Sequence, residues 1–333
     1  MSEAKRVFPS GKKTEVFYAV ISQGVPLFRT EGVGDVSTFN VVVKDQVYEL
    51  PVILPEKVQA KLRRILLEKL RRSYQSLPKD FKMKVLERAS AMGYKRAKEE
   101  WNCYVAPPME RTSSTDVGMC GYCPSCTVLG NITDSSMKDN ISTTYGVKSR
   151  VVHDVAFALT DVRRGVAEVT HNKVSDGVSY TGQSLYADMH VVPGVVFVGK
   201  LAMYDLTEEE EKAILDSLSS ISRMGGGETK YGSVKIVILG CKDGDRETLS
   251  SYDVMREMMK EHQGKLLDSD VIVDELKGFV KGKGFKECNV GEVKYEKLWE
   301  DSLEFASDMD KMIASVDDKL RKGREGGHGK KPK

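Results

Sequence analysis

Residues 221–239 constrain the fold most, because they join a helix to a strand through three consecutive glycines. The preceding helix begins at a capping box, Thr207-Glu-Glu-Glu210, in which the Thr207 hydroxyl accepts from the N3 amide and Glu210 reaches back. Acids in this first turn favour the positive end of the helix dipole, so no metal is needed to explain them. Together with the strand-like residues 184–203, which break at Pro193-Gly194, the pattern predicts a βαβ unit.

Gly225, Gly226 and Gly227 suit a loop that holds a phosphate chain, because glycine reaches φ > 0 without strain and lets a ligand approach the backbone. Lys230 adds a positive charge and Tyr231 a stacking surface. The order of helix, glycines and strand excludes a P-loop, which follows a strand and opens a helix. A helix cap followed by a turn explains the glycines alone equally well.

The composition indicates a soluble globular protein of 333 residues, enough for two domains or one core with large insertions. No apolar run approaches the roughly 20 residues that span a bilayer. The N-terminal residues also lack the apolar stretch of a secretory signal. We therefore expect a cytoplasmic location and no membrane partner. A net charge of +2 excludes a uniformly basic protein but allows local basic surfaces.

Three thiols at two-residue spacings, Cys120, Cys123 and Cys126, lie in residues 101–150, where apolar residues are few. Such a segment needs a source of stability other than burial. The spacing lets neighbouring sulfurs reach one tetrahedral ion, and the lack of an export signal favours metal over disulfides. The sequence therefore predicts a structural Zn²⁺ site, with a redox pair or free thiols as the alternatives.

A fourth zinc ligand has to come from another segment. Cys103 is the nearest candidate, and His153 and His171 are the substitutes. No His-x-Glu precedes the cysteines, so the pattern is not that of a zinc deaminase. Cys241 and Cys288 stand alone in the sequence and are interpreted as buried apolar residues.

The first part of the chain reads as strands followed by a basic helix. Residues 14–22, 38–43 and 47–54 are strand-like, and the glycine-rich loop 23–35 carries Arg29, either a ligand contact or a solvated surface charge. From Pro55 the apolar spacing becomes helical, with a basic opposite side. This basic side includes Lys61, Arg64, Arg71 and Arg72. It is either a solvated face or a surface for a polyanion.

The rest of the chain adds one more strand and several helices. Residues 151–159 are strand-like, His190 lies in an apolar setting as a hydrogen-bonded core histidine, and residues 252–262, 271–281 and 293–321 are predicted helices. Residues 323–333 are expected to be a disordered tail.

Three motifs in order resemble one family. The loop from Gly225 to Gly232 matches a C-terminal glycine-rich loop. The excursion from Arg163-Arg164 to Gly177, with Lys173, resembles a protruding hairpin, and the cysteine segment resembles a zinc-bearing insertion. The chain is similar to the backbone subunit of type I-D CRISPR interference complexes, in the superfamily of repeat-associated RNA-binding proteins.

This resemblance implies an α+β fold with an RRM-like, or ferredoxin-like, core. The core would be discontinuous, from residues 10–55 and 150–240. Residues 56–149 would form an insertion with the basic helix and the zinc segment, and residues 241–322 a helical C-terminal part.

The resemblance also implies a role in antiviral defence. Copies of the chain would form a helical filament along the spacer of a CRISPR guide RNA, with other interference-complex subunits, and leave bases exposed to pair with a target. Binding would be independent of RNA sequence, because contacts to the sugar-phosphate backbone carry no base information. The expected RNA-binding residues are Arg29, Lys61, Arg64, Arg163, Arg164, Lys173, Gly225, Gly226, Gly227, Lys230 and Tyr231.

An enzymatic role is the less favoured alternative. Relatives in type III complexes cut target RNA with an aspartate in a loop after the first strand, and Asp35 lies in a comparable loop here. A tight turn with an Asx hydrogen bond explains Asp35 as well. A metal-dependent enzyme unrelated to RNA is a third class of function, which chelation would separate from a structural zinc site.

Overall fold

The computed structural model describes residues 11–28, 36–97, 100–105, 118–133, 137–139, 144–171 and 186–327. Its centre is a seven-stranded antiparallel sheet in the order β11-β1-β10-β7-β3-β2, with β6 also paired to β10. The strands are β1 (Lys13–Ser22), β2 (Thr38–Val43), β3 (Gln46–Ile53), β6 (Val151–His153), β7 (Ala156–Ala158), β10 (Val196–Tyr204) and β11 (Val234–Gly244).

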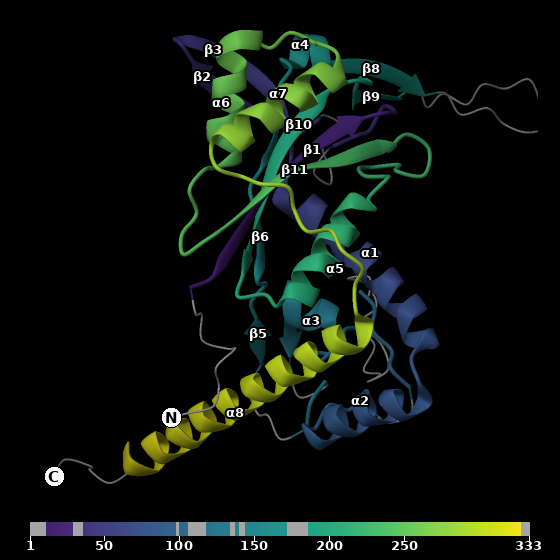
Figure 1. Cartoon of the computed structure of the whole chain (residues 1–333), viewed down its shortest axis with the longest axis vertical. Coiled ribbons are helices and arrows are strands. Elements are labelled where there is room, and N and C mark those ends of the chain that lie inside the picture. Colours follow the sequence, from purple (N-terminus) through teal and green to yellow (C-terminus); the bar gives the residue numbers. More distant parts are fainter. Residues whose placement is uncertain are drawn as a thin grey trace, which may run out of the picture.

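Helices cover both faces of this sheet (Figure 1). On one face lie α1 (Pro55–Ser76) and α5 (Glu208–Ser219), and on the other lie α6 (Ser251–His262) and α7 (Ser269–Gly282). Strand β1 contributes Val16, Tyr18 and Val20 to the first core and Phe17, Ala19 and Ile21 to the second. Because successive side chains of a strand point to opposite faces, its unbroken apolar run follows from burial on both sides. The predicted α+β class is confirmed.

The predicted βαβ unit is present in a split form. Strands β10 and β11 both pair antiparallel with β1, one on each side, so they run parallel to each other with β1 between them. The connecting helix α5 has the predicted cap: the Glu210 amide donates to Thr207 Oγ1 at 3.3 Å, and Glu210 Oε2 accepts from the Thr207 amide at 2.9 Å.

The predicted strands 38–43 and 47–54 pair as a hairpin of β2 and β3, and both residues of its turn, Lys44 and Asp45, have positive φ angles of 49° and 63°. This conformation matches the right-handed twist of the flanking strands. The predicted single strand 151–159 is instead two short strands, β6 and β7, separated by Asp154 and Val155.

A two-stranded ribbon of β8 (Val166–His171) and β9 (Tyr186–Val191) is present where the sequence predicts a protruding hairpin over residues 163–177. Strand β8 lies within that range and β9 beyond it, and residues 172–177 lie outside the described part of the chain. The ribbon leaves the body of the molecule beside the end of β1 (Figure 1). Arg163 and Arg164 lie just before the ribbon, in the short helix α4 (Val162–Gly165). The strand-like residues 184–203 thus contribute to two sheets: β9 pairs with β8, and β10, after Pro193-Gly194, joins the central sheet.

The inserted segment packs against the C-terminal helix. It contains α2 (Lys79–Ala91), α3 (Pro124–Leu129), β4 (Asn131–Thr133) and β5 (Tyr145–Val147), and α8 (Tyr295–Gly327) contacts α1, α2, α3 and α5. In this contact the rings of Tyr74, Trp101 and Trp299 form a cluster with centroid separations of 4.9 to 5.4 Å. These rings join the inserted segment to α8 through apolar contact.

Helix α8 continues through Gly327, past the predicted start of the tail at residue 323 (Figure 1). Residues 328–333 lie outside the described part of the chain. In the described residues, every helix is too short or too polar to cross a bilayer.

Candidate nucleic-acid interface and metal centre

Two loops meet at one end of the β1–β11 pair: residues 23–28, here called the β1 loop, and residues 224–232, the glycine loop. The Gly226 amide donates to the Leu27 carbonyl at 2.7 Å, and the Val25 amide donates to the Tyr231 carbonyl at 3.1 Å. These backbone bonds fix the position of each loop relative to the other.

This close approach requires glycine at position 225. Gly225 has a φ angle of +96°, and a Cβ atom added there would lie 2.7 Å from the Leu27 carbonyl oxygen. Gly227 also has a positive φ of 59°, whereas Gly226 does not. Gly225 and Gly226 are half-buried and Gly227 is exposed. One predicted phosphate donor, the Gly226 amide, is therefore already bonded to the β1 loop.

The predicted cations around the loop differ in their surroundings. The Lys61 ammonium, on α1, forms an ion pair of 3.0 Å with Glu228 in the glycine loop. The Arg223 guanidinium donates to the carbonyls of Glu228 and Thr229. Lys61 thus positions the loop. Lys230 is exposed on the glycine loop, and Arg64 is exposed on α1.

Tyr231 packs against the base of the ribbon. Its ring lies edge-to-face on His190, with centroids 5.2 Å apart and planes at 73°. His190 is 1% exposed and its Nδ1 lies 2.7 Å from the Val25 carbonyl, which confirms a hydrogen-bonded core histidine. Because the Val191 amide also donates to Pro26, the β1 loop, glycine loop and ribbon form one connected surface, here called the loop surface.

Arg163 and Arg164 are both exposed on α4. The Arg163 guanidinium donates to Asp161, the N-cap of α4, at 2.7 Å. Burial raises the pKa of Asp161, but hydrogen bonds and charge attraction from Arg163 outweigh burial and lower it overall. The ion pair with Asp161 therefore restrains the Arg163 guanidinium, although 79% of the side chain is exposed.

Arg29, Asp35 and Lys173 lie outside the described residues, so their contacts with RNA and cleavage by Asp35 stay predictions. The side chain of His171 is also outside the described part.

The sulfurs of Cys103, Cys120, Cys123 and Cys126 lie within 4.8 Å of one another, and all four residues are buried. Cys103 therefore completes the predicted set. His153, one of the two substitutes, is not part of this group. It lies in β6, buried, and burial lowers its pKa to about 4.

The four sulfurs fit a tetrahedral ion. The Sγ atoms of Cys103 and Cys126 are 3.6 Å apart, and those of Cys120 and Cys126 are 4.0 Å apart. A tetrahedron with Zn–S bonds of about 2.3 Å has sulfur–sulfur edges of about 3.8 Å. The amides of Cys120 and Gly121 donate to Cys103 Sγ and Cys126 Sγ at 3.4 and 3.3 Å, which stabilises thiolates.

The thiol pKa values show how such a cluster distributes charge. Burial raises the pKa of Cys120, but hydrogen bonds from the other three cysteines outweigh burial and lower it well below its usual range. The pKa of Cys123 is raised by burial and by the same neighbours. The four thiols therefore titrate as one coupled group, and a divalent cation would supply the charge that stabilises their thiolate forms.

The model of the Csc2 CRISPR family matches residues 1–326. The chain belongs to the Csc2 family. The crystal structure of Csc2 from Thermofilum pendens is 32% identical, covers 95% of this chain and 93% of its own, and superposes with a TM-score of 0.76. No curated protein matches the chain.

Two other solved structures resemble this chain more weakly. One is a type IV-B CRISPR complex, 12% identical with a TM-score of 0.39, covering 67% of this chain and 90% of its own. The other is a CRISPR RNA-guided surveillance complex in a pre-nicking state, 11% identical with a TM-score of 0.45, covering 88% of this chain and 100% of its own. Family membership itself supports the predicted class, an RNA-binding backbone subunit of a CRISPR interference complex.

The interpretation of Cys241 and Cys288 as isolated apolar residues is wrong. The two are half-buried and form a disulfide with Cα atoms 5.1 Å apart. Cys241 and Lys286 exchange backbone hydrogen bonds of 2.8 and 2.9 Å, which brings residue 288 beside β11. The preference for metal over disulfides therefore applies to only four of the six cysteines. The two cysteines are 47 residues apart, so no local sequence pattern predicts that they pair.

Sequence reasoning also missed the residues that hold the glycine loop. Leu27 accepts and Val25 donates through the backbone, and the Arg223 guanidinium donates to the Glu228 and Thr229 carbonyls. Leu27 does carry one local signal: it follows Pro26 in the turn after β1, where a chain exposes its carbonyls.

Proposed function

We propose that this Csc2-family chain is the guide-RNA-binding backbone subunit of a type I-D CRISPR interference complex, a cytoplasmic ribonucleoprotein of antiviral defence. Copies line the spacer RNA in a helical filament, contact the other subunits, and leave bases free to pair with a target. The observation that carries the proposal is the match to the Csc2 family over residues 1–326.

The sheet supports an RRM-like, or ferredoxin-like, core. The strands β11-β1-β10-β7 lie in the order 4-1-3-2 of a β-α-β-β-α-β unit if β1, β7, β10 and β11 are numbered along the chain. The two helices of this unit are α5 and α1, which contact each other on one face of the sheet, so we assign α1 to the core and not to the insertion predicted over residues 56–149. The insertion with the cysteine cluster lies between α1 and β7 in sequence.

The loop surface supplies groups that suit an RNA backbone. Lys230 and Arg164 are exposed cations, and Gly227 leaves its backbone accessible. Tyr231 offers a ring edge supported by His190. We infer that Arg29, Lys173 and the exposed end of Arg163 add charge, while Lys61 acts by holding Glu228 and Arg64 lies on the flank. None of these groups requires a particular base, so binding is independent of RNA sequence.

The metal in this proposal is Zn²⁺ bound by Cys103, Cys120, Cys123 and Cys126. Four protein ligands close the coordination sphere and leave no position for a reacting water, so the ion acts as a structural cross-link. The cluster joins the start of α3 to residues 103 and 120, which are otherwise connected through residues outside the described part.

Fluorescence anisotropy with two unstructured RNA oligomers of unrelated sequence tests the proposal, each titrated at several salt concentrations. Affinities for the two RNAs should agree within about threefold and fall steeply with salt, because bound phosphates release counterions. Lys230→Ala should reduce the slope of log affinity against log salt by about 0.7, the value for one phosphate contact on a single strand. Lys311→Ala, an exposed lysine on α8, is the control. Absence of binding at low salt, or binding of only one sequence, would contradict the proposal.

A further inference from the structure

The outer edge of β11 is open along its central part. Strand β11 ends the sheet and pairs with β1 on one side only. On its outer side the Val234 amide donates to Ser222, and Cys241 exchanges two bonds with Lys286. Between these contacts, across residues 235–240, no described residue pairs with the outer edge. The open part spans roughly 20 Å at about 3.3 Å per residue.

The open part presents backbone groups ready for a further strand. In an antiparallel strand the amide and carbonyl of one residue point to the same side, and the side alternates along the chain. Because the Val234 amide points outward, the amides and carbonyls of Ile236 and Ile238 point outward as well. An extended peptide placed here would form the same kind of ladder that β1 forms on the inner side.

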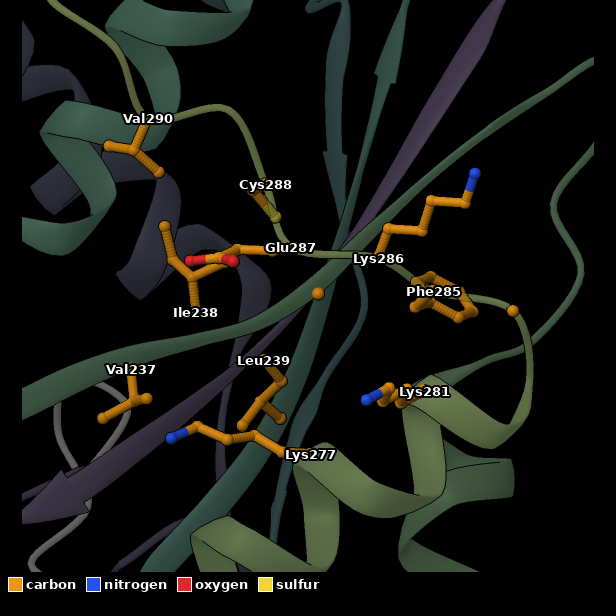
Figure 2. A pocket seen from close by; sticks show the side chains of 12 residues that line it. Val237, Ile238, Leu239, Lys277, Lys281, Phe285, Lys286, Glu287, Cys288 and Val290 are labelled. Carbon is orange, nitrogen blue, oxygen red and sulfur yellow. The ribbon is translucent and has the colours of Figure 1, made fainter.

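A cavity of about 780 Å³ lies beside this edge (Figure 2). On one side of the strand, α7 presents Lys277 and Lys281 next to Val237 and Leu239. On the other side, Val290 and Glu287 lie near Ile238. The disulfide at Cys288 fastens the segment that carries Glu287 and Val290 to β11, so this wall is held in place.

We propose that the open edge of β11 binds an extended segment of a partner protein in which acidic side chains alternate with apolar ones. Side chains of an added strand point alternately to the two faces of the sheet. Those on the α7 side meet the exposed ammonium groups of Lys277 and Lys281, which favour carboxylates. Those on the other side meet Ile238 and Val290, which is 47% exposed, and these favour apolar side chains.

A peptide fits this edge better than a nucleic acid does. The Ile236 and Ile238 backbone offers donors and acceptors in alternation, which a peptide strand complements and a phosphate chain does not. Phe285, the aromatic residue lining the cavity, is 2% exposed and offers no face for stacking a base. This site is separate from the loop surface and does not depend on the proposed RNA binding.

The test uses the full chain and a fluorescein-labelled peptide of alternating Glu and Val, followed by fluorescence anisotropy. The double variant Lys277→Glu, Lys281→Glu should weaken binding about tenfold through loss of two surface ion pairs. A matched double variant on α2, Lys79→Glu with Lys84→Glu, changes net charge equally and should change affinity less than about twofold. Thermal unfolding of each variant checks that it is folded.

A second arm uses the unmodified chain, so it does not depend on how any variant folds. The same peptide with alternate backbone amides N-methylated keeps its charge but loses its ladder donors, and should bind about tenfold more weakly or not at all. Equal binding of the methylated peptide would overturn the proposal, as would absence of binding by the parent peptide. Displacement of the peptide by oligouridylate would assign the groove to RNA, and self-association that the peptide suppresses would assign the edge to a second copy; either result overturns it too.

Discussion

Substituting Gly225 by alanine, with Gly226→Ala as the matched control, tests whether the β1 loop and the glycine loop act as one unit. Gly225 has a φ angle of +96°, and its added Cβ would lie 2.7 Å from the Leu27 carbonyl oxygen, a backbone atom that cannot rotate away. Gly226 has no positive φ, and its added Cβ would lie 3.4 Å from the flexible end of the Leu27 side chain.

The two effects at Gly225 add. Holding a residue other than glycine in such a conformation costs about 1–3 kcal/mol. Relief of the contact requires the loops to separate, which removes the Gly226–Leu27 hydrogen bond at about 0.5–1.5 kcal/mol. Gly225→Ala should therefore lower the free energy of unfolding by about 2–4 kcal/mol. Gly226→Ala should change it by less than about 1 kcal/mol, since alanine also lowers the entropy of the unfolded chain.

Urea denaturation and RNA anisotropy on both variants provide the assay. If the loop surface binds RNA, separated loops should bind RNA at least about tenfold more weakly in the folded Gly225→Ala protein, whereas Gly226→Ala should stay within about twofold of the parent. Equal stabilities for the two variants would refute the geometric reasoning. A destabilised Gly225→Ala protein with unchanged RNA affinity would instead remove the glycine loop from the RNA surface.

Three further predictions concern the cysteines and His153. Cys123→Ser should reduce bound zinc, measured with a colorimetric chelator, from about one ion per chain to well below one, whereas Cys241→Ser should leave the zinc content unchanged. Reduction of the Cys241–Cys288 bond, which closes a separation of 47 residues, should lower the free energy of unfolding by up to about 4 kcal/mol; an unchanged denaturation midpoint would contradict this. Burial lowers the pKa of His153 from 6.5 to about 4. Between pH 6.5 and pH 4 the unfolded chain therefore binds one more proton at this residue than the folded chain does. The free energy of unfolding should fall by up to about 3 kcal/mol as the pH drops through this range. His153→Leu should flatten that part of the profile in denaturation experiments from pH 4 to 8, and an unaltered slope would assign it to other groups.

Local patterns were sufficient to predict most elements of this fold. The apolar run of β1, the capping box at Thr207 and the helical spacing after Pro55 each depend on neighbours within a few residues. The predicted helices 252–262, 271–281 and 293–321 correspond to α6, α7 and α8 within a few residues at each end, except that α8 extends to Gly327. The two-residue spacing of Cys120, Cys123 and Cys126 likewise predicted that their sulfurs lie together, and Cys103 was the nearest thiol that could be the fourth ligand.

Most of the features that sequence reasoning missed join distant residues. The insertion of β1 between β10 and β11 depends on pairing across about 175 to 230 positions, which no local period records. Lys61 reads as a free cation on a basic face, yet it pairs with Glu228. The disulfide and the contact of α8 with the inserted segment arise in the same way, from packing that only the assembled sheet and helices define.

Native mass spectrometry of the chain with unstructured RNAs of increasing length tests the central claim most directly. A backbone subunit that lines guide RNA should bind as one copy to a short RNA and add further copies in regular steps as the RNA lengthens, regardless of sequence. A constant ratio of one chain per RNA at every length, or no complex at all at low salt, would contradict the account.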